Sequence, residues 1–294
     1  MQCFKRVFAI SLFAFCLIVP IVARAQEERT EKSFSVTPGG WLELRADFGS
    51  VDVRSWSQNE VKVEVIKWVE GRSRRSASEL FKDFEISFNQ TSRGVSIVAK
   101  MYGGSKRWWR SNDGLQVEFR LTVPQKYNLD LNTSGGSISV DNLTGEARVK
   151  TSGGGITVGD VDGDVDVETS GGSINVDGAT GNLRAHTSGG GISLRRLHGS
   201  VDASTSGGSL SAELLEQFDA ACELSTSGGG IVVYLAPGIK ADIDVRTSGG
   251  DVESDLPITV QGSIGEGKLQ GKLNGGGPLL TLRTSGGDIR LRQR

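Results

Sequence analysis

The sequence predicts an all-β protein, a parallel single-stranded β-solenoid built from repeats of about 18 residues, and three observations lead to it. The tetrapeptide Thr-Ser-Gly-Gly occurs eight times, and its first five copies are evenly spaced. Between these copies, apolar and polar residues alternate with the period of half-buried strands. The 294 residues include 41 glycines, while only 6% are aromatic. This balance suits a β-rich repeat chain and argues against a membrane channel, a disulfide-stapled miniprotein or a collagen.

The repeat is defined by its own spacing. Its copies begin at Thr133, Thr151, Thr169, Thr187, Thr205, Thr226, Thr247 and Thr284. The first five lie at every 18th position, and the last three steps are longer, above all the step from Thr247 to Thr284. The later units therefore carry insertions, which we expect to form loops on one side of the stack.

Each unit contains two short strands and two turns. A second glycine follows half a unit later, at Gly145, Gly163, Gly181, Gly199 and Gly238. A two-strand unit cannot bury its apolar face alone, so stacking of successive units is the economical solution. An antiparallel up-and-down sheet is the alternative, but identical residues at every 18th position favour in-register stacking of like on like.

The chain before the first repeat is related but irregular. Residues 49–65 resemble a degenerate coil, so the solenoid is expected to start near Trp41. An insertion follows, with a short helix expected around 76–82 and strands near 84–88 and 95–99. We therefore predict a signal peptide at 1–25, an N-terminal β region at 26–132 and the repeat solenoid at 133–294, with 26–294 forming one continuous domain.

Residues 1–25 have the three parts of a secretory signal. Lys5 and Arg6 precede an apolar stretch over 7–22, and Ala23-Arg24-Ala25 provides a cleavage site. Retention as a membrane anchor is the alternative. Cleavage leaves 30 basic and 35 acidic residues, a net charge of 30 − 35 = −5, which disfavours nucleic-acid binding. No later segment is long and apolar enough to span a membrane. We expect an exported protein, in the periplasm or at the cell surface.

Motifs that could indicate catalysis or the binding of a nucleotide or metal match their known patterns only in part. Gly262–Lys268 fits most of a phosphate-binding loop, but Leu269 stands where Ser or Thr is needed. Asp160, Asp162, Asp164 and Asp166 alternate without the spacing of a calcium loop. The two histidines, His186 and His198, have no Ser-Asp or metal-ligand spacing around them. We predict no catalytic residue, no cofactor and no metal.

Two further features are assigned structural roles. After cleavage Cys222 is the one remaining cysteine, and it follows an apolar alternation, so we expect a buried, inert thiol. Arg290, Arg292 and Arg294 alternate with apolar residues at the C-terminus. We expect them to place charge on an open edge strand, where charge prevents edge-to-edge aggregation.

One segment stands out as a candidate for partner binding. Lys106, Arg107, Trp108, Trp109 and Arg110 form a basic aromatic cluster between glycine-containing flanks. Tryptophan and arginine are typical of binding hot spots. The alternative is that one or both tryptophans cover the open N-terminal end of the solenoid.

Together, the recurring TSGGxIxV, the opening WLELRADFGSVDV and the late LNGGGPLLTLRTSGGDIRLR resemble the bacterial DUF4097 family, also called the toastrack domain, which includes adhesin candidates. The resemblance covers roughly Trp41 to Arg294. It implies a right-handed β-helix on exported or envelope-facing proteins, some of which accompany membrane-stress responses and act as interaction hubs. It supplies no catalytic residues.

The functional prediction combines these points. We expect an exported, non-enzymatic β-solenoid that serves as an envelope-associated interaction module, with a link to envelope stress. Its partner would be an envelope protein. The alternative is a cell-surface adhesin that binds glycan or matrix, and a carbohydrate-active enzyme on a β-helix comes third.

Overall fold

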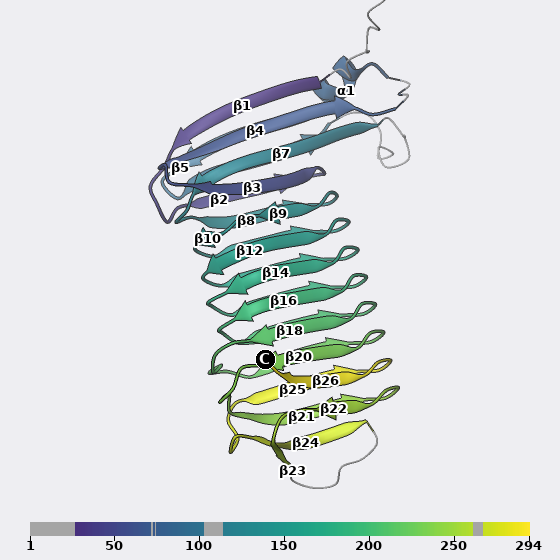
Figure 1. The fold of residues 1–294 in the computed structure, drawn as a ribbon. Coiled ribbons are helices and arrows are strands. Elements are labelled where there is room, and N and C mark those ends of the chain that lie inside the picture. Colours follow the sequence, from purple (N-terminus) through teal and green to yellow (C-terminus); the bar gives the residue numbers. More distant parts are fainter. Residues whose placement is uncertain (1–26, 72, 74, 103–113, 261–266) are drawn as a thin grey trace, which may run out of the picture.

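The computed structural model describes residues 27–71, 73, 75–102, 114–260 and 267–294. Within them, two 13-stranded sheets face each other along a rod, and each coil of chain contributes one strand to each sheet (Figure 1). The predicted signal peptide and the Lys106–Arg110 segment lie outside the described residues. In the described part, no helix is long and apolar enough to cross a membrane.

The first sheet, called sheet A, runs from the N-terminal end of the rod to the other. Its strands, in spatial order, are β1 (Glu27–Ser35), β4 (Glu60–Val69), β7 (Leu115–Pro124), β3 (Ser50–Trp56), β9 (Ile138–Val140), β12 (Ile156–Asp162), β14 (Ile174–Ala179), β16 (Ile192–Leu197), β18 (Leu210–Leu214), β20 (Ile231–Leu235), β26 (Ile289–Gln293) and β22 (Val252–Ser254), with β10 (Leu143–Thr144) beside β12.

The second sheet, called sheet B, covers the other side of the core. Its strands, in spatial order, are β5 (Phe84–Thr91), β6 (Gly94–Met101), β2 (Trp41–Ala46), β8 (Asn128–Thr133), β11 (Ala147–Thr151), β13 (Val165–Thr169), β15 (Leu183–Thr187), β17 (Val201–Thr205), β19 (Cys222–Thr226), β25 (Leu279–Thr284), β21 (Ala241–Thr247), β24 (Lys268–Leu273) and β23 (Ile258–Val260).

The central coils stack in parallel and in register. Ile156 pairs with Ile174, and Ile174 pairs with Ile192, so equivalent residues of neighbouring coils are one repeat apart. This pairing confirms the solenoid, excludes the antiparallel alternative, and shows that one coil is one repeat long rather than two. The residue after each Gly-Gly alternates between Ser and Gly, as at Ser137, Gly155, Ser173 and Gly191. This alternation therefore falls on alternate coils, and nothing in the structure explains it.

The core lies between the two sheets. Inward positions are β-branched or aliphatic and fully buried, as at Val158, Val167 and Leu194, while their neighbours along each strand are more exposed. Burial of one such side chain contributes about 1.5–3 kcal/mol. A single cluster of buried residues extends from Leu42 to Leu291.

The threonine of each repeat forms an internal ladder. Its hydroxyl is buried in most coils and donates to the carbonyl oxygen of a glycine in the neighbouring coil, as in Thr169 to Gly154 at 2.7 Å and Thr187 to Gly172 at 2.8 Å. A buried hydroxyl needs a partner, and the stacked turn supplies one. The Thr-Ser-Gly-Gly motif therefore serves stacking.

The second glycine of each motif is required by close approach of the stacked turns. A Cβ on Gly154 would lie 2.1 Å from the carbonyl oxygen of Gly136, and a Cβ on Gly172 would lie 2.1 Å from that of Gly154. The first glycine is less constrained. A Cβ on Gly153 would meet nothing closer than 3.8 Å, and in later coils the nearest backbone oxygen would lie at 2.9–3.2 Å.

The C-terminal coil lies inside the stack, which corrects one prediction. Strands β25 and β26 are inserted between β19/β20 and β21/β22 (Figure 1). Arg290 and Arg292 are therefore on an inner strand, Arg294 directly follows it, and the three arginines do not protect an edge. They form ion pairs instead: Arg292 contacts Glu253 at 2.5 Å and Asp255 at 2.7 Å, and Arg294 contacts Glu213.

The longest step between repeats, from Thr247 to Thr284, also differs from the expected loop. It contains β22, β23 and β24, and β24 pairs antiparallel with the outer edge of β21. That edge is thereby closed, so β25 pairs with the other edge of β21. Asn274, Gly275 and Gly276 have positive φ where the chain reverses before β25.

The N-terminal end is built differently. Strand β7 pairs with β3 in parallel, and β4 and β1 extend sheet A beyond it as antiparallel strands. Helix α1 (Ala77–Asp83) confirms the helix prediction, and Ser76 and Glu79 form its capping box. The buried ammonium of Lys67 donates to the carbonyl oxygen of Phe81 at 3.1 Å and pairs with Glu28 at 2.6 Å, which fixes the C-terminal turn of the helix to sheet A.

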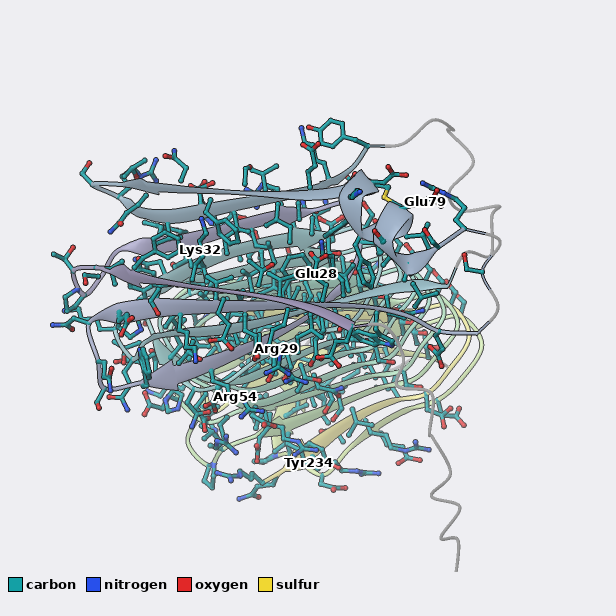
Figure 2. The ribbon with its side chains drawn as sticks, turned by 90° about the horizontal axis from the view of Figure 1, so that it is seen from above. Glu28, Arg29, Lys32, Arg54, Glu79 and Tyr234 are labelled. Carbon is teal, nitrogen blue, oxygen red and sulfur yellow. The ribbon has the colours of Figure 1, made fainter. Side chains whose placement is uncertain are left out.

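Edge protection occurs at this N-terminal end. The outermost strand of sheet A, β1, carries Glu28, Arg29 and Lys32, whose side chains are seen from above in Figure 2. Charged side chains on an edge strand disfavour pairing with another chain.

Candidate binding groove

The two outer faces of the rod carry different chemistry. Along sheet B, outward positions of successive coils alternate in charge, as in Arg148, Asp166, Arg184 and Asp202. Lys150 pairs with Glu168 across neighbouring coils at 2.6 Å. This face is a solvated charge ladder.

Sheet A has one uncharged outward row over the same coils. This row is Ser139, Thr157, Asn175, Ser193 and Ser211, at equivalent positions of β9, β12, β14, β16 and β18, and the next outward row includes Asp177, Arg195 and Glu213. Within the described part of the chain, these five side chains form no hydrogen bond with another protein group. Their donors and acceptors are therefore available to a ligand.

A groove crosses this face beside β3. It consists of three adjoining depressions of about 350, 310 and 440 Å³. The first two share Asp52, Ser139 and Thr157, and the last two share Asn142. Larger outward residues of β3 and β7 form one wall, and the small side chains of β9 and β12 form the floor. The first two depressions follow β3 from residue 50 to residue 54, roughly 15 Å at the rise of an extended strand. The third touches β3 at Ser55 and runs across the coils as far as Arg196 and His198.

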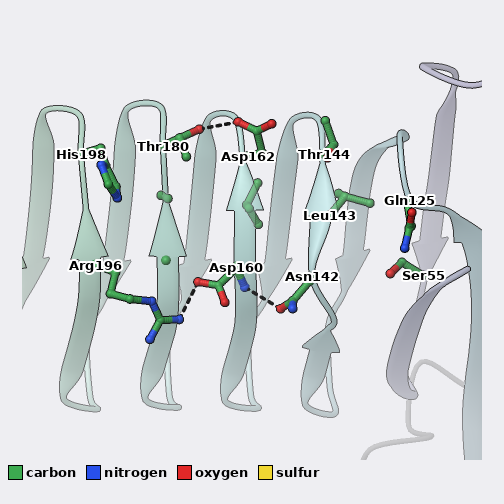
Figure 3. A pocket seen from close by; sticks show the side chains of 13 residues that line it. Ser55, Gln125, Asn142, Leu143, Thr144, Asp160, Asp162, Thr180, Arg196 and His198 are labelled. Carbon is green, nitrogen blue, oxygen red and sulfur yellow. Dashed lines mark hydrogen bonds and ion pairs between the residues drawn. The ribbon is translucent and has the colours of Figure 1, made fainter.

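The largest depression contains an ion pair that bridges two coils. Arg196 Nη2 donates to Asp160 Oδ1 at 2.5 Å, across the coil that contains Gly178 (Figure 3). A Cβ on Gly178 would lie 2.2 Å from that carboxylate oxygen, so the glycine is needed for the pair. Arg196 itself has φ 44° and sits where the register with β18 shifts, a left-handed conformation that is uncommon for a side-chain-bearing residue.

A second row lines the same depression. The Thr180 hydroxyl donates to Asp162 at 2.9 Å (Figure 3). His198 Nδ1 lies 3.1 Å from a Glu216 carboxylate oxygen. Both acidic residues of this depression, Asp160 and Asp162, are exposed, and the described residues contain no cluster of His, Cys, Asp or Glu that could hold a metal ion.

The other histidine has neighbours that its sequence spacing did not predict. Coil stacking brings Ser204 Oγ to 2.7 Å from His186 Nδ1, and Asp202 Oδ2 to 3.8 Å from His186 Nε2. These are the residue types of a nucleophilic triad. They lie on the open face of sheet B, however, on strands whose backbone pairs with neighbouring coils on both sides, so no free pair of N–H groups forms an oxyanion hole at Ser204.

The cysteine prediction is confirmed. Cys222 is fully buried at the start of β19, and its Sγ accepts a hydrogen bond from the Val201 N–H at 3.4 Å. Burial raises the pKa of Cys222 to about 11, although the Val201 bond opposes this rise. The neutral thiol is a core group and not a nucleophile at physiological pH.

The predicted binding segment and the groove are distinct. Lys106, Arg107, Trp108, Trp109 and Arg110 lie outside the described residues, so their role in partner binding stays a prediction. The sequence did not indicate the groove, because the groove depends on β3 lying beside β9, and these strands are far apart in sequence.

Comparison with known proteins places the chain in a family. No curated protein shows significant similarity to the sequence. Two solved structures of adhesin candidates are similar to it. The Bacteroides fragilis protein is 11% identical, with 90% of this chain and 97% of that chain covered and a TM-score of 0.49. The Parabacteroides distasonis protein is 12% identical, with 91% and 97% covered and a TM-score of 0.43. The Toastrack DUF4097 family matches residues 42–292, and the chain therefore belongs to that family.

Proposed function

We propose that this protein is an exported, non-catalytic binding module of the bacterial envelope. The observation that carries the proposal is that the repeated residues and the outward residues of each coil have different roles. The repeated Thr and Gly residues are engaged in stacking, while the outward residues beside β3 form a groove with unpartnered polar side chains. A scaffold of this kind presents a surface rather than an enclosed reaction site. We extend the same proposal to envelope-stress signalling, to which a protein partner would link this module.

A cell-surface adhesin is the second candidate. The groove favours it, because an open, polar surface of small side chains suits an extended ligand. The two candidates differ in location, since an adhesin must face the medium.

Protease accessibility on cells tests both. A C-terminally tagged chain is digested on intact cells and on cells whose outer barrier has been opened. Protection that is lost on opening supports an envelope module, and digestion on intact cells supports the adhesin. Retention in the cytoplasm after the barrier is opened contradicts export and the proposal. A fluorophosphonate probe that labels Ser204, and fails to label a Ser204→Ala variant, would contradict the non-catalytic part.

A further inference from the structure

The groove beside β3 recognises ligands through side chains alone. Strands β3, β9 and β12 are inner strands, each paired on both sides. Their backbone N–H and C=O groups are therefore occupied, and a peptide cannot bind there by adding a strand to an edge. A ligand must instead be recognised by the hydroxyl, amide and carboxylate groups that line the groove.

The floor of the groove is rich in groups that both donate and accept. Ser137, Ser139, Thr157, Ser173 and Asn175 are all exposed. A hydroxyl donates one hydrogen bond and accepts others, and an amide does both. In the described residues, the side chains of Ser137 and Ser173, like the other three, have no protein partner. Such a floor complements a ligand whose own groups donate and accept along its length.

The charge of the walls selects against anions. Carboxylates outnumber arginines among the lining residues, which are Asp52, Glu118, Asp141, Asp160, Asp162 and Asp177 against Arg54 and Arg196. Both of these arginines are already paired with a carboxylate, at 3.1 Å for Arg54 with Asp52 and at 2.5 Å for Arg196 with Asp160. Arg120 and Arg195, outside the lining, pair with Glu118 at 2.9 Å and with Asp177 at 3.7 Å. The excess negative charge that a polymer of uronic acids or phosphates would meet is therefore that of Asp141 and Asp162.

We propose that the groove binds a neutral, extended oligosaccharide that lies along β3 and reaches into the third depression at Asp160. The inference rests on the proposed function, a binding module, and names its ligand class. Sugar hydroxyls bond to the uncharged floor, and the Asp160–Arg196 pair offers its remaining carboxylate oxygen and guanidinium N–H groups to neighbouring hydroxyls at one end.

The test uses linear hexasaccharides as probes, followed by calorimetry and by NMR titration of the chain. The neutral probes are maltohexaose, cellohexaose and chitohexaose, and hexagalacturonate is the acidic one. The groove variant is Ser139→Leu with Thr157→Leu. The matched control is Ser193→Leu with Ser211→Leu, which makes similar changes in the same outward row beyond the groove. Thermal unfolding of both variants checks that they fold.

The expected result is binding of at least one neutral hexasaccharide, at least tenfold tighter than hexagalacturonate. The groove variant should weaken this binding at least tenfold, and the control variant less than twofold. The inference is overturned by absence of neutral binding, by tighter binding of the acidic probe, or by equal losses in the two variants. If the chain is exported and binds envelope material but no neutral glycan, the proposed function stands and the glycan assignment falls.

If the groove variant fails to fold, Asp160→Asn supplies the second measurement. It removes one carboxylate charge at an exposed position and should weaken neutral binding at least threefold. An unchanged affinity in that variant would remove the Asp160–Arg196 pair from the site and overturn the placement of the ligand.

Discussion

The central coils and the terminal coils of the rod use the same strand pairing but differ in order. From β8 to β20, each coil stacks on the one that precedes it in sequence. At both ends the order is crossed: β2/β3 lies between β6/β7 and β8/β9, and β25/β26 lies between β19/β20 and β21/β22. The repeat therefore specifies how coils stack, and other elements specify which coils become neighbours.

The elements that set the order are antiparallel strands. At the N-terminal end, β4 and β5 close the outer edges of β7 and β6. At the other end, β24 closes the outer edge of β21. In each case one edge remains open for a parallel partner, and a terminal coil of the chain fills it. The groove lies beside β3, where the crossed N-terminal coils meet the central ones, so the distinctive surface arises where the regular order ends.

The largest expected effect comes from removing the C-terminal coil. A chain that ends at Pro278 lacks β25 and β26, which pair with β19 and β20 on one side and β21 and β22 on the other. Hydrogen exchange should then show loss of protection over 241–260 and 267–273, while 138–205 stay protected. Continued protection of 241–254 would mean that β20 and β22 pair directly, and that sequential stacking is as stable as the crossed order.

The reactivity of the Cys222 thiol reports on the contact between β19 and the inserted strand β25. It pairs with Leu280 of the inserted coil, and burial raises its pKa to about 11. At pH 8 we expect the native chain to react with a thiol reagent at least a hundredfold more slowly than the unfolded chain, and the Pro278-terminated chain to react faster than the native one. Equal rates in the native and truncated chains would argue that β25 does not cover Cys222.

The raised pKa of Cys222 also determines how the stability of the fold changes with pH. As pH rises from about 9 to about 11, the unfolded chain loses its thiol proton before the folded chain does. The thiol's contribution to stability is therefore present below pH 9 and decreases through that window. A Cys222→Ala variant should show a weaker alkaline loss in denaturant titrations at several pH values, and an unchanged loss would assign the effect to other groups.

In the central coils, two adjacent glycines distinguish two explanations for the motif: a need for close stacking and a need for a flexible turn. Gly154→Ala places a Cβ 2.1 Å from a backbone oxygen, whereas Gly153→Ala meets nothing within 3.8 Å. We expect the first to lower the free energy of unfolding by about 3 kcal/mol and the second by less than about 1 kcal/mol. Denaturant titration of both variants measures the difference. Equal losses would show that backbone freedom, and not stacking distance, explains the glycines.

The threonine ladder should contribute less per residue. Thr169→Val removes a buried hydroxyl that bonds Gly154 at 2.7 Å, and we expect a loss of about 1–2 kcal/mol in unfolding free energy. Thr157→Val, which changes the outward face of a neighbouring strand, is the control and should be close to neutral. If Thr169→Val leaves the free energy of unfolding unchanged, the threonine ladder does not contribute to stability.

The smallest effect is expected at the charges of the inserted coil. Arg292→Gln breaks pairs with the exposed carboxylates of Glu253 and Asp255. Exposed pairs of this kind contribute little to stability and weaken with salt. Chemical denaturation in urea at two salt concentrations measures the loss. A loss well beyond the range of exposed ion pairs would show that charge, and not the closed edge of β21, directs the insertion.

The sequence predicted the structure of a single coil but not which coils lie next to one another in the stack. Periodicity placed Ile156, Val158 and Thr169 inward and identified the helix near Ser76, because these features depend on local alternation and capping. The crossed ends depend on antiparallel pairings such as β21 with β24, which carry no periodic signal. The same limit applies to the groove, whose floor and wall come from residues around 139 and 52, and to the contact of His186 with Ser204, which exists only once the coils are stacked in register.

The most direct test of the account is hydrogen exchange of the full chain with and without an envelope fraction from the source bacterium. The account predicts new protection in segments 137–144 and 156–162, which border the groove, and little change in β11 and β13 on the charged face. Protection confined to sheet B strands, or no change at any described segment, would contradict the claim that the groove beside β3 is the binding surface.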